Sequence, residues 1–182
     1  MKIMVVSDIH GSAYYCRQML EAFEKENPNK LLCLGDILYH GPRNDLPEGY
    51  APKEVIAMLN DEKVKSKIAC VRGNCDTEVD QMVLDFPILA DYCILFAGDR
   101  QIYATHGHVY GENNPPKLSG NDILLNGHTH VPACNQHDGY LYINPGSVSI
   151  PKENSHHGYM IIDDSEITWK SLDGEIKNRI AL

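Results

Sequence analysis

Seven side chains able to bind a metal ion stand at the ends of short apolar segments of this sequence. The segments are IMVVS, LLCLG, IACVRG, IYAT and ILLNG, and the side chains that follow them are Asp8, His10, Asp36, Asn74, His106, His128 and His130. In α/β sheets ligands bind at the carboxyl ends of strands, so we expect the five ends to converge on one site. Almost no other reactive side chain stands there, and the pattern therefore predicts metal chemistry.

The spacing within two of these motifs supports a shared site. Residues i and i+2 of an extended segment point to the same side, so Asp8 with His10, and His128 with His130, are expected to aim at one point. Imidazole and carboxylate ligands without a thiolate suit Mn²⁺, Fe²⁺ or Zn²⁺. Seven ligands are too many for one ion, whereas two ions sharing a bridging carboxylate would use them all.

Each motif alone also has an ordinary structural interpretation. A single DxH or GHTH occurs in turns, and an Asp after an apolar run is a common helix cap. The ordered set of DxH, GD, GNxD, THGH and GHTH at five predicted strand ends is what indicates a site.

Helical patterns separate the apolar segments only in the first half of the chain. Ser12 is a candidate N-cap for a helix over 12–27, Pro52 suits the first turn of a helix over 52–62, and a short helix follows from about Thr77. After Pro87 the patterns are those of strands, with hairpin turns at 97–100, 138–139 and 163–165. A βαβαβ half and a mostly antiparallel half predict two sheets packed face to face with helices outside.

Composition narrows the class of protein. The 182 residues are 43% hydrophobic and 23% charged, which is ordinary for a globular protein, and we expect one domain over 1–182 because no linker or repeat interrupts the chain. The net charge of −9 and the lack of a Lys/Arg cluster argue against strong nucleic-acid binding. No apolar run approaches the roughly 18 residues of a membrane span, and the N-terminus lacks a signal-peptide pattern, so we expect a cytoplasmic protein. The six cysteines form no CxxC pair and are expected to be reduced.

The ordered motifs resemble the calcineurin-like metallophosphoesterase superfamily, and the resemblance spans nearly the whole chain. SDIHGS, GDILYHGPRN, LPEGYAP, VRGNCDTEVDQM, THGH, GHTHVP and NPGSVSIPK are similar to the small bacterial phosphodiesterases of the YfcE type. The resemblance implies an α/β fold, a four-layer α/β/β/α sandwich of two mixed sheets flanked by helices. It also implies two divalent metal ions, usually Mn²⁺ in this subgroup, with Zn²⁺, Fe²⁺ and Ni²⁺ as alternatives.

The family pattern, carried onto this sequence, gives each ion four ligands. One ion would be held by Asp8, His10, Asp36 and His130, and the other by Asp36, Asn74, His106 and His128, with Asp36 bridging. Such a pair polarises a bridging water to hydroxide, which attacks phosphorus in line with the leaving oxygen. The implied activity is hydrolysis of small phosphodiesters, with Asp36, Asn74, Cys75 and His106 as candidate catalytic residues. The alternatives are a phosphomonoesterase or protein phosphatase on the same centre, and a non-catalytic interaction scaffold with this fold.

Cys75 departs from the wider superfamily, where a histidine commonly follows Asn in a GNH motif. A thiol with an ordinary pKa of about 8.5 has no cationic form with which to stabilise a leaving group. We therefore hypothesise that Cys75 tunes leaving-group preference and is not a covalent nucleophile. Asp76 is interpreted either as the N-cap of the following helix or as a substitute acid.

The loop over 39–51 carries three candidate substrate-binding residues. Arg43 would fork onto a phosphate oxygen, Asn44 lies beside it, and Tyr50 would stack on an aromatic substituent. The alternative for Arg43 is an ion pair with Asp45 or Glu48 that stiffens the loop.

Three further features have no settled role in the sequence. His108 is either a support for the ligands or a structural residue, and His156 and His157 are expected to be solvated. The apolar and aromatic segment GYLYINPG is a candidate edge for self-association into a homo-oligomer.

Overall fold

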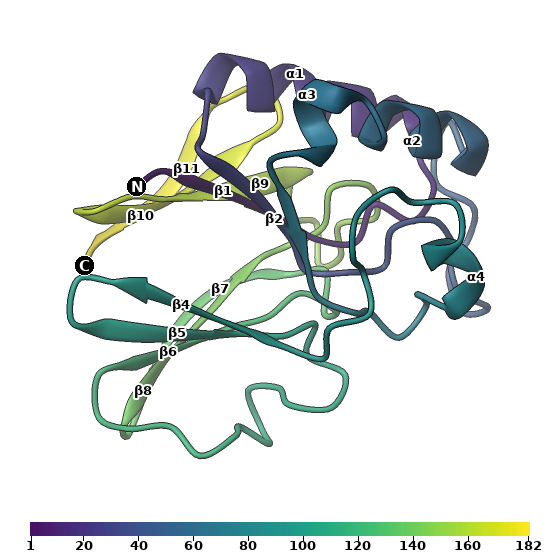
Figure 1. Cartoon of the computed structure of the whole chain (residues 1–182). Helices are drawn as coiled ribbons and strands as arrows, with labels where there is room; N and C mark the ends of the chain where they lie inside the picture. The colour runs from purple at the N-terminus through teal and green to yellow at the C-terminus, as the bar shows by residue number, and fades with distance from the viewer.

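Two mixed β-sheets pack face to face in the computed structural model, which describes the whole chain, residues 1–182 (Figure 1). The six-stranded sheet consists, in spatial order, of β11 (Ile176–Ala181), β10 (Glu166–Ser171), β9 (Gly158–Ile162), β1 (Ile3–Val6), β2 (Lys30–Cys33) and β3 (Ile68–Cys70). The five-stranded sheet consists of β4 (Cys93–Ala97), β5 (Arg100–Ala104), β6 (Asp122–Leu125), β8 (Tyr140–Pro145) and β7 (Pro132–His137). Strands β1, β2 and β3 are parallel to one another, as are β5, β6 and β8.

The helices cover the outer face of the six-stranded sheet. They are α1 (Ala13–Glu26), α2 (Pro52–Leu59) and α3 (Glu62–Lys65), while α4 (Glu78–Gln81) lies at the end of the sandwich (Figure 1). The helix predicted over 12–27 is confirmed, because the Ser12 hydroxyl accepts the Tyr15 N–H at the start of α1. The helix predicted over 52–62 ends earlier, at Leu59, because Asp61 caps the separate helix α3.

The outer face of the five-stranded sheet carries a long loop in place of a helix. In this loop Leu118 packs against Leu124, Tyr140 and Tyr142, and the Tyr140 hydroxyl donates to the Glu112 carbonyl at 2.9 Å. The predicted α/β class with two mixed sheets is confirmed, with helices on one outer face and this loop on the other (Figure 1).

Strand β1 explains how the two cores are divided. Met4 and Val6 pack toward the helices, while Ile3 and Val5 pack between the two sheets. Successive side chains of a strand alternate between its faces, so a strand buried on both faces reads as one continuous apolar run. This is why IMVV shows no alternation in the sequence.

The hairpins predicted after Pro87 are confirmed by the pairs β4–β5, β7–β8 and β9–β10. The expectation of an aromatic edge in GYLYINPG was wrong, because β8 lies between β6 and β7 and all six of its residues are buried. The last strand, β11, was not expected from the sequence. It is a mostly exposed edge strand in which Lys177, Asn178 and Arg179 separate the apolar residues, so it shows no apolar alternation.

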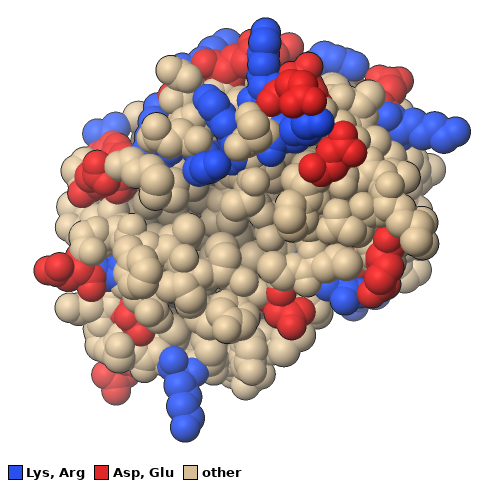
Figure 2. Space-filling model, in the orientation of Figure 1, with Lys and Arg blue, Asp and Glu red and all other residues tan.

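Charged side chains of both signs are interspersed on the face of the molecule seen in Figure 2. They gather mainly over the helical layer, and the middle of this face is nearly free of them. None of the helices is both long enough and apolar enough to cross a bilayer.

Candidate metal centre

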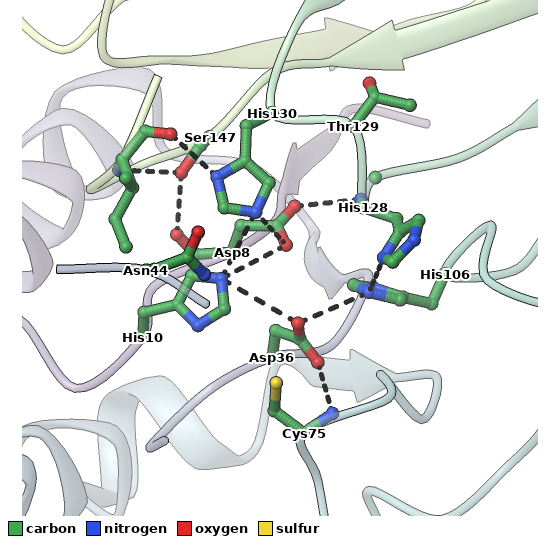
Figure 3. Close-up of polar contacts among 12 residues, drawn as sticks. Asp8, His10, Asp36, Asn44, Cys75, His106, His128, Thr129, His130 and Ser147 are labelled. Atoms are coloured by element: carbon green, nitrogen blue, oxygen red, sulfur yellow. Dashed lines mark hydrogen bonds and ion pairs between the residues drawn. The ribbon is translucent and has the colours of Figure 1, made fainter. Parts of the chain in front are cut away.

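The seven predicted ligands come together from both sheets, and Figure 3 labels all of them except Asn74. Asp8 and His10 follow β1, Asp36 follows β2, and Asn74 follows β3; His106 follows β5, and His128 and His130 follow β6. In each sheet these strands are parallel, so their carboxyl ends lie together at one end of that sheet. The contact between His106 and Asp36 joins the strand ends of the two sheets. The predicted convergence of the strand ends is therefore present in the structure.

Left-handed turns, and not the alternation of extended strands, aim these side chains. Five of the seven ligands have φ between 48° and 64°: Asp8, His10, Asp36, His128 and His130. Residues other than glycine rarely adopt this conformation, at a cost of about 1–3 kcal/mol each, and such strain concentrates at functional sites. The i, i+2 argument from the sequence predicted the right pairs for a different geometric reason.

Glycines let the neighbouring turns approach one another closely. A Cβ on Gly73 would collide with the Asp36 carboxylate, and one on Gly127 would collide with the Ser7 side chain. The centre is thus assembled by backbone segments that only glycine allows to touch.

The first group of ligands contains Asp8, His10 and His130 beside Asp36. The His130 Nε2 lies 3.3 Å from Asp8 Oδ1, and the His10 Nε2 lies 3.5 Å from the same oxygen. The His10 Nε2 also lies 3.7 Å from Asp36 Oδ2 and 3.3 Å from the His130 Nε2.

The second group contains Asn74, His106 and His128 beside the same Asp36. The His106 Nε2 lies 3.4 Å from Asp36 Oδ2, 3.1 Å from Asn74 Oδ1 and 3.2 Å from the His128 Nδ1. Asp36 Oδ2 therefore faces both groups, as a bridging carboxylate would.

Backbone carbonyls orient three of the imidazoles. The Nδ1 atoms of His10, His106 and His130 each lie 2.7 Å from a carbonyl, those of Tyr39, Leu34 and Ile150 respectively. An Nδ1 that donates to a carbonyl carries the proton, which leaves the lone pair on Nε2. The three Nε2 lone pairs all point into the space between Asp8 and Asp36.

One buried carboxylate oxygen in this space faces imidazole nitrogens but accepts no hydrogen bond. Asp8 is fully buried, and its Oδ1 accepts no hydrogen bond, although its Oδ2 accepts the His128 N–H at 3.1 Å. Burial would raise the pKa of Asp8, yet the imidazoles of His10 and His130 hold it well below its usual range. A buried, ionised oxygen that faces nitrogen lone pairs fits divalent cations, so the residues suit the metal ions that the sequence pattern predicted.

The loop over 146–151, directly after β8, supports the predicted ligands, a role that sequence reasoning missed. The Ser147 and Ser149 hydroxyls both donate to the Asp8 carbonyl, at 2.9 and 3.0 Å, and the Ile150 carbonyl orients His130. NPGSVSIPK was noted only for its resemblance, and nothing in its residue types indicates which hydroxyl would face the centre.

Asp76 is a structural acceptor. Its carboxylate, 2% exposed, accepts the backbone N–H groups of Asp36, Ile37 and Gly73 at 2.8, 2.9 and 2.7 Å. Its interpretation as a helix N-cap was wrong, because Thr77 occupies that position. Asp76 instead ties the turn after β2 to the turn after β3.

Cys75 lies beside the Asp36 carboxylate. Its backbone N–H donates to Asp36 Oδ1 at 2.8 Å, and the Asn74 amide donates to its sulfur at 3.2 Å. Burial and the charge of Asp36 raise the pKa of the Cys75 thiol to about 12. In the metal-free protein the thiol is therefore neutral at physiological pH and is not primed as a nucleophile.

A polar cleft of about 380 Å³ opens over the centre. Arg43 and Asn44 line it, as predicted for substrate-binding residues, and so does Lys152, which sequence reasoning missed. The alternative for Arg43 is not observed, because its guanidinium pairs with neither Asp45 nor Glu48; Asn44 donates to the His40 carbonyl at 2.8 Å.

Tyr50 lies outside this cleft. Its ring packs against Gly11, where a Cβ would meet it at 2.5 Å, and its centroid lies 5.4 Å from that of His40. Tyr50 lines a separate, adjacent hollow.

Two further histidines, His108 and His157, are not among the predicted ligands. The His108 ring lies 5.4 Å from that of His106 but outside both ligand groups. His157 was expected to be solvated, but it stacks on Tyr15 at 3.9 Å and its Nδ1 lies 2.9 Å from the Val148 carbonyl. A separate hollow of about 860 Å³ lies among α1, α2 and α3 and contains none of the predicted ligands.

Comparison with known proteins identifies the family. A model of the calcineurin-like phosphoesterase superfamily domain matches residues 1–166, which is most of the chain. The chain belongs to this superfamily. It is similar to the phosphodiesterase YfcE of Escherichia coli K12, with 49% identity over 149 residues that cover 82% of this chain and 80% of that protein.

Solved structures of the superfamily share the fold. A structure of E. coli YfcE superposes with a TM-score of 0.94 and 45% identity, covering 100% of this chain and 99% of that one. A mutant of Vps29 from Entamoeba histolytica matches with a TM-score of 0.62 and 22% identity over 100% of this chain and 99% of that chain. The second likeness shows the fold alone.

Proposed function

We propose that this protein is a two-metal-dependent phosphodiesterase that hydrolyses small phosphodiesters, with the whole chain acting as one domain. The observation that carries the proposal is the position of Asp36 Oδ2, which faces one ligand group containing His10 and another containing His106. Membership of the superfamily and the likeness to a named phosphodiesterase support the same activity.

The two ligand groups define the residues that would hold the ions. One ion is assigned to Asp8, His10, Asp36 and His130, and the other to Asp36, Asn74, His106 and His128. We propose Mn²⁺ as the metal because the resemblance to the YfcE-type phosphodiesterases implies it; the imidazole, carboxylate and amide ligands suit Zn²⁺ and Fe²⁺ as well. The bound pair would turn a bridging water into the hydroxide that attacks phosphorus in line, and would neutralise charge on the phosphate.

The chain's own residues complete the phosphate site. Two divalent ions carry +4 and Asp8, Asp36 and a hydroxide subtract three, which leaves about +1 to balance one diester anion. Arg43 and Lys152 line the cleft beside the ligands, and their side chains form no ion pair in the protein. We assign them to the oxygens of the phosphate that do not react, with Arg43 as the bidentate donor.

Cys75 is assigned to the leaving group. A neutral thiol at the border of the cleft donates a proton only weakly, so substrates whose leaving oxygen departs easily are favoured. We assign no proton transfer to Asp76, since its carboxylate accepts three backbone N–H groups.

A phosphomonoesterase on the same centre is the second candidate. The sequence offered few basic residues to hold a dianion, but the structure places Lys152 beside Arg43 in the cleft. The positive charges of these two side chains would help to balance the second negative charge of a monoester. The scaffold alternative has only the fold likeness to Vps29 in its favour.

Hydrolysis of a chromogenic aryl phosphodiester, compared with the matching monoester, tests the proposal. The protein is stripped of metal and refilled separately with Mn²⁺, Zn²⁺ and Mg²⁺. We expect turnover only after metal is added, highest with Mn²⁺, and faster for the diester. Faster turnover of the monoester would favour the second candidate, and hydrolysis of neither ester by the metal-loaded protein would contradict both.

A further inference from the structure

A second hollow, of about 400 Å³, adjoins the polar cleft. It lies between α2 and α4, and seven of its eleven lining residues are hydrophobic. Tyr39, Tyr50 and Ile56 line it from the side of α2 and the preceding loop, and Val79 and Val83 line it from α4 and the residues after it. It is therefore an apolar groove on the surface beside the metal centre.

Cys75 is the residue that the cleft and the groove share. The cleft has a single hydrophobic lining residue and suits a phosphate, whereas an apolar group has no favourable surface there. Tyr39, which lines the groove, also contacts a predicted ligand, because its carbonyl lies 2.7 Å from the His10 Nδ1. An apolar group attached to a phosphate in the cleft has its nearest apolar surface on the far side of Cys75.

The groove leaves apolar side chains in contact with water. Val79 is 67% exposed, Tyr39 42% and Val83 41%, and they gather in one place. The charged residues that line the groove, Lys53 and Asp80, are opposite in sign. Clustered exposed apolar side chains mark a binding surface, and the balanced charge does not favour an ionic ligand.

Because the groove adjoins the cleft at Cys75, we propose that the groove binds an apolar aryl or alkyl substituent on the leaving oxygen of the phosphodiester. The inference rests on the proposed function, and it adds the substrate class: a phosphodiester with one hydrophobic group on its leaving side. The leaving oxygen lies next to Cys75, and the substituent extends over Tyr39 toward Val79 and Val83.

The test measures binding and does not depend on turnover. Titration calorimetry of the Mn²⁺-loaded protein gives the Kd of inorganic phosphate and of methyl, propyl and pentyl phosphate. We expect the Kd to fall about twofold for each added methylene, the factor expected when about half of the surface of each methylene is buried. In the double variant Val79→Asn/Val83→Asn the Kd should fall by less than about 1.3-fold for each methylene, because the two substitutions remove the apolar surface that the alkyl chain would contact.

A matched variant controls for the substitution itself. Val109 is 56% exposed and does not line the groove, so Val109→Asn should keep the dependence of wild type. An unchanged Kd for inorganic phosphate in all variants shows that the centre is intact.

The outcomes separate this inference from the proposed function. A Kd that does not depend on chain length in wild type, with phosphate bound and aryl diester hydrolysed, overturns the groove and leaves the phosphodiesterase standing. A dependence that survives in Val79→Asn/Val83→Asn places the alkyl chain elsewhere and also overturns the groove. Failure of the metal-loaded protein to bind phosphate at all contradicts the proposed function, and the groove with it.

Discussion

Asp8 and Asp76 are two buried carboxylates at the same end of the sandwich, and the protein treats them in opposite ways. Asp76 accepts three backbone N–H groups through its two oxygens. Asp8 leaves Oδ1 without any donor, facing the Nε2 atoms of His10 and His130. A buried charge is costly unless it is paired, so Asp76 is completed by the chain itself, whereas Asp8 requires a partner from outside.

The same comparison extends to Glu26, far from the centre. Its carboxylate accepts from Lys2 and Lys170 at 2.6 Å and from Tyr159 at 3.0 Å. Carboxylates of this kind are completed by side chains and carry no metal chemistry. Asp8 and Asp76 are both buried and differ in their donors, which is what separates a structural acid from a candidate metal ligand.

The largest expected effect comes from Asp8→Asn. Removing a ligand of the first ion should lower diester turnover by more than about 100-fold, since even the partners of metal ligands are worth about 10–100-fold. Steady-state kinetics measures the turnover, and metal analysis counts the ions that the variant retains. A variant that keeps both ions and its turnover would contradict the assignment of Asp8.

The Asp76→Asn variant should mainly lose stability. An amide offers one oxygen and places an N–H₂ group against backbone donors, so at least one buried N–H loses its acceptor. We expect the free energy of unfolding of the metal-free protein to fall by about 1–3 kcal/mol. Unchanged stability together with a loss of activity would make Asp76 catalytic and not structural.

A smaller effect, confined to selectivity, is expected for Cys75→His. An imidazole can donate a proton and also carry positive charge, so turnover of diesters with poor leaving groups should rise by about tenfold or more, while activated aryl diesters change little. The comparison requires a series of diesters with leaving groups of increasing pKa. Unchanged selectivity would contradict the role of Cys75. Complete loss of activity in Cys75→Ser, with both metals retained, would instead indicate an essential thiol.

No effect on activity is expected for Glu26→Gln. This substitution should alter only the pH dependence of the free energy of unfolding. Burial alone would raise the pKa of Glu26, but its bonds to Lys170 and Lys2 lower it. Because the folded pKa is the lower one, the stabilisation is present above the unfolded pKa of about 4.3 and is lost as the pH falls through the folded value. Urea unfolding of wild type and variant should therefore differ at pH 7 and converge in acid. A constant difference across this range would contradict the ion pairing of Glu26.

Much of the architecture is encoded locally and could be predicted. Ser12 caps α1, Pro52 begins α2, and the hairpin turns fall where the turn residues stand. These features depend on residues close in sequence. Strand β11 was missed because an exposed edge strand such as Ile176–Ala181 carries no apolar alternation.

The candidate site also combines local features with features that depend on distant parts of the chain. The seven candidate ligands could be identified because each follows an apolar run and because their residue types indicate metal binding. The roles of Asp76, Ser147 and Lys152 depend on contacts between turns far apart in the chain, which no local pattern records. Tyr50 shows the converse: it is close to the ligands in sequence, yet it packs on Gly11 and faces a different space.

The number of metal ions that the chain binds tests the central claim most directly. Metal-free protein is titrated with Mn²⁺, and bound metal and diester turnover are measured on the same samples. The shared position of Asp36 predicts two Mn²⁺ ions per chain, with turnover that appears only as the second ion binds. Saturation at one ion, or full turnover with one ion bound, would contradict the assignment of two ligand groups around Asp36.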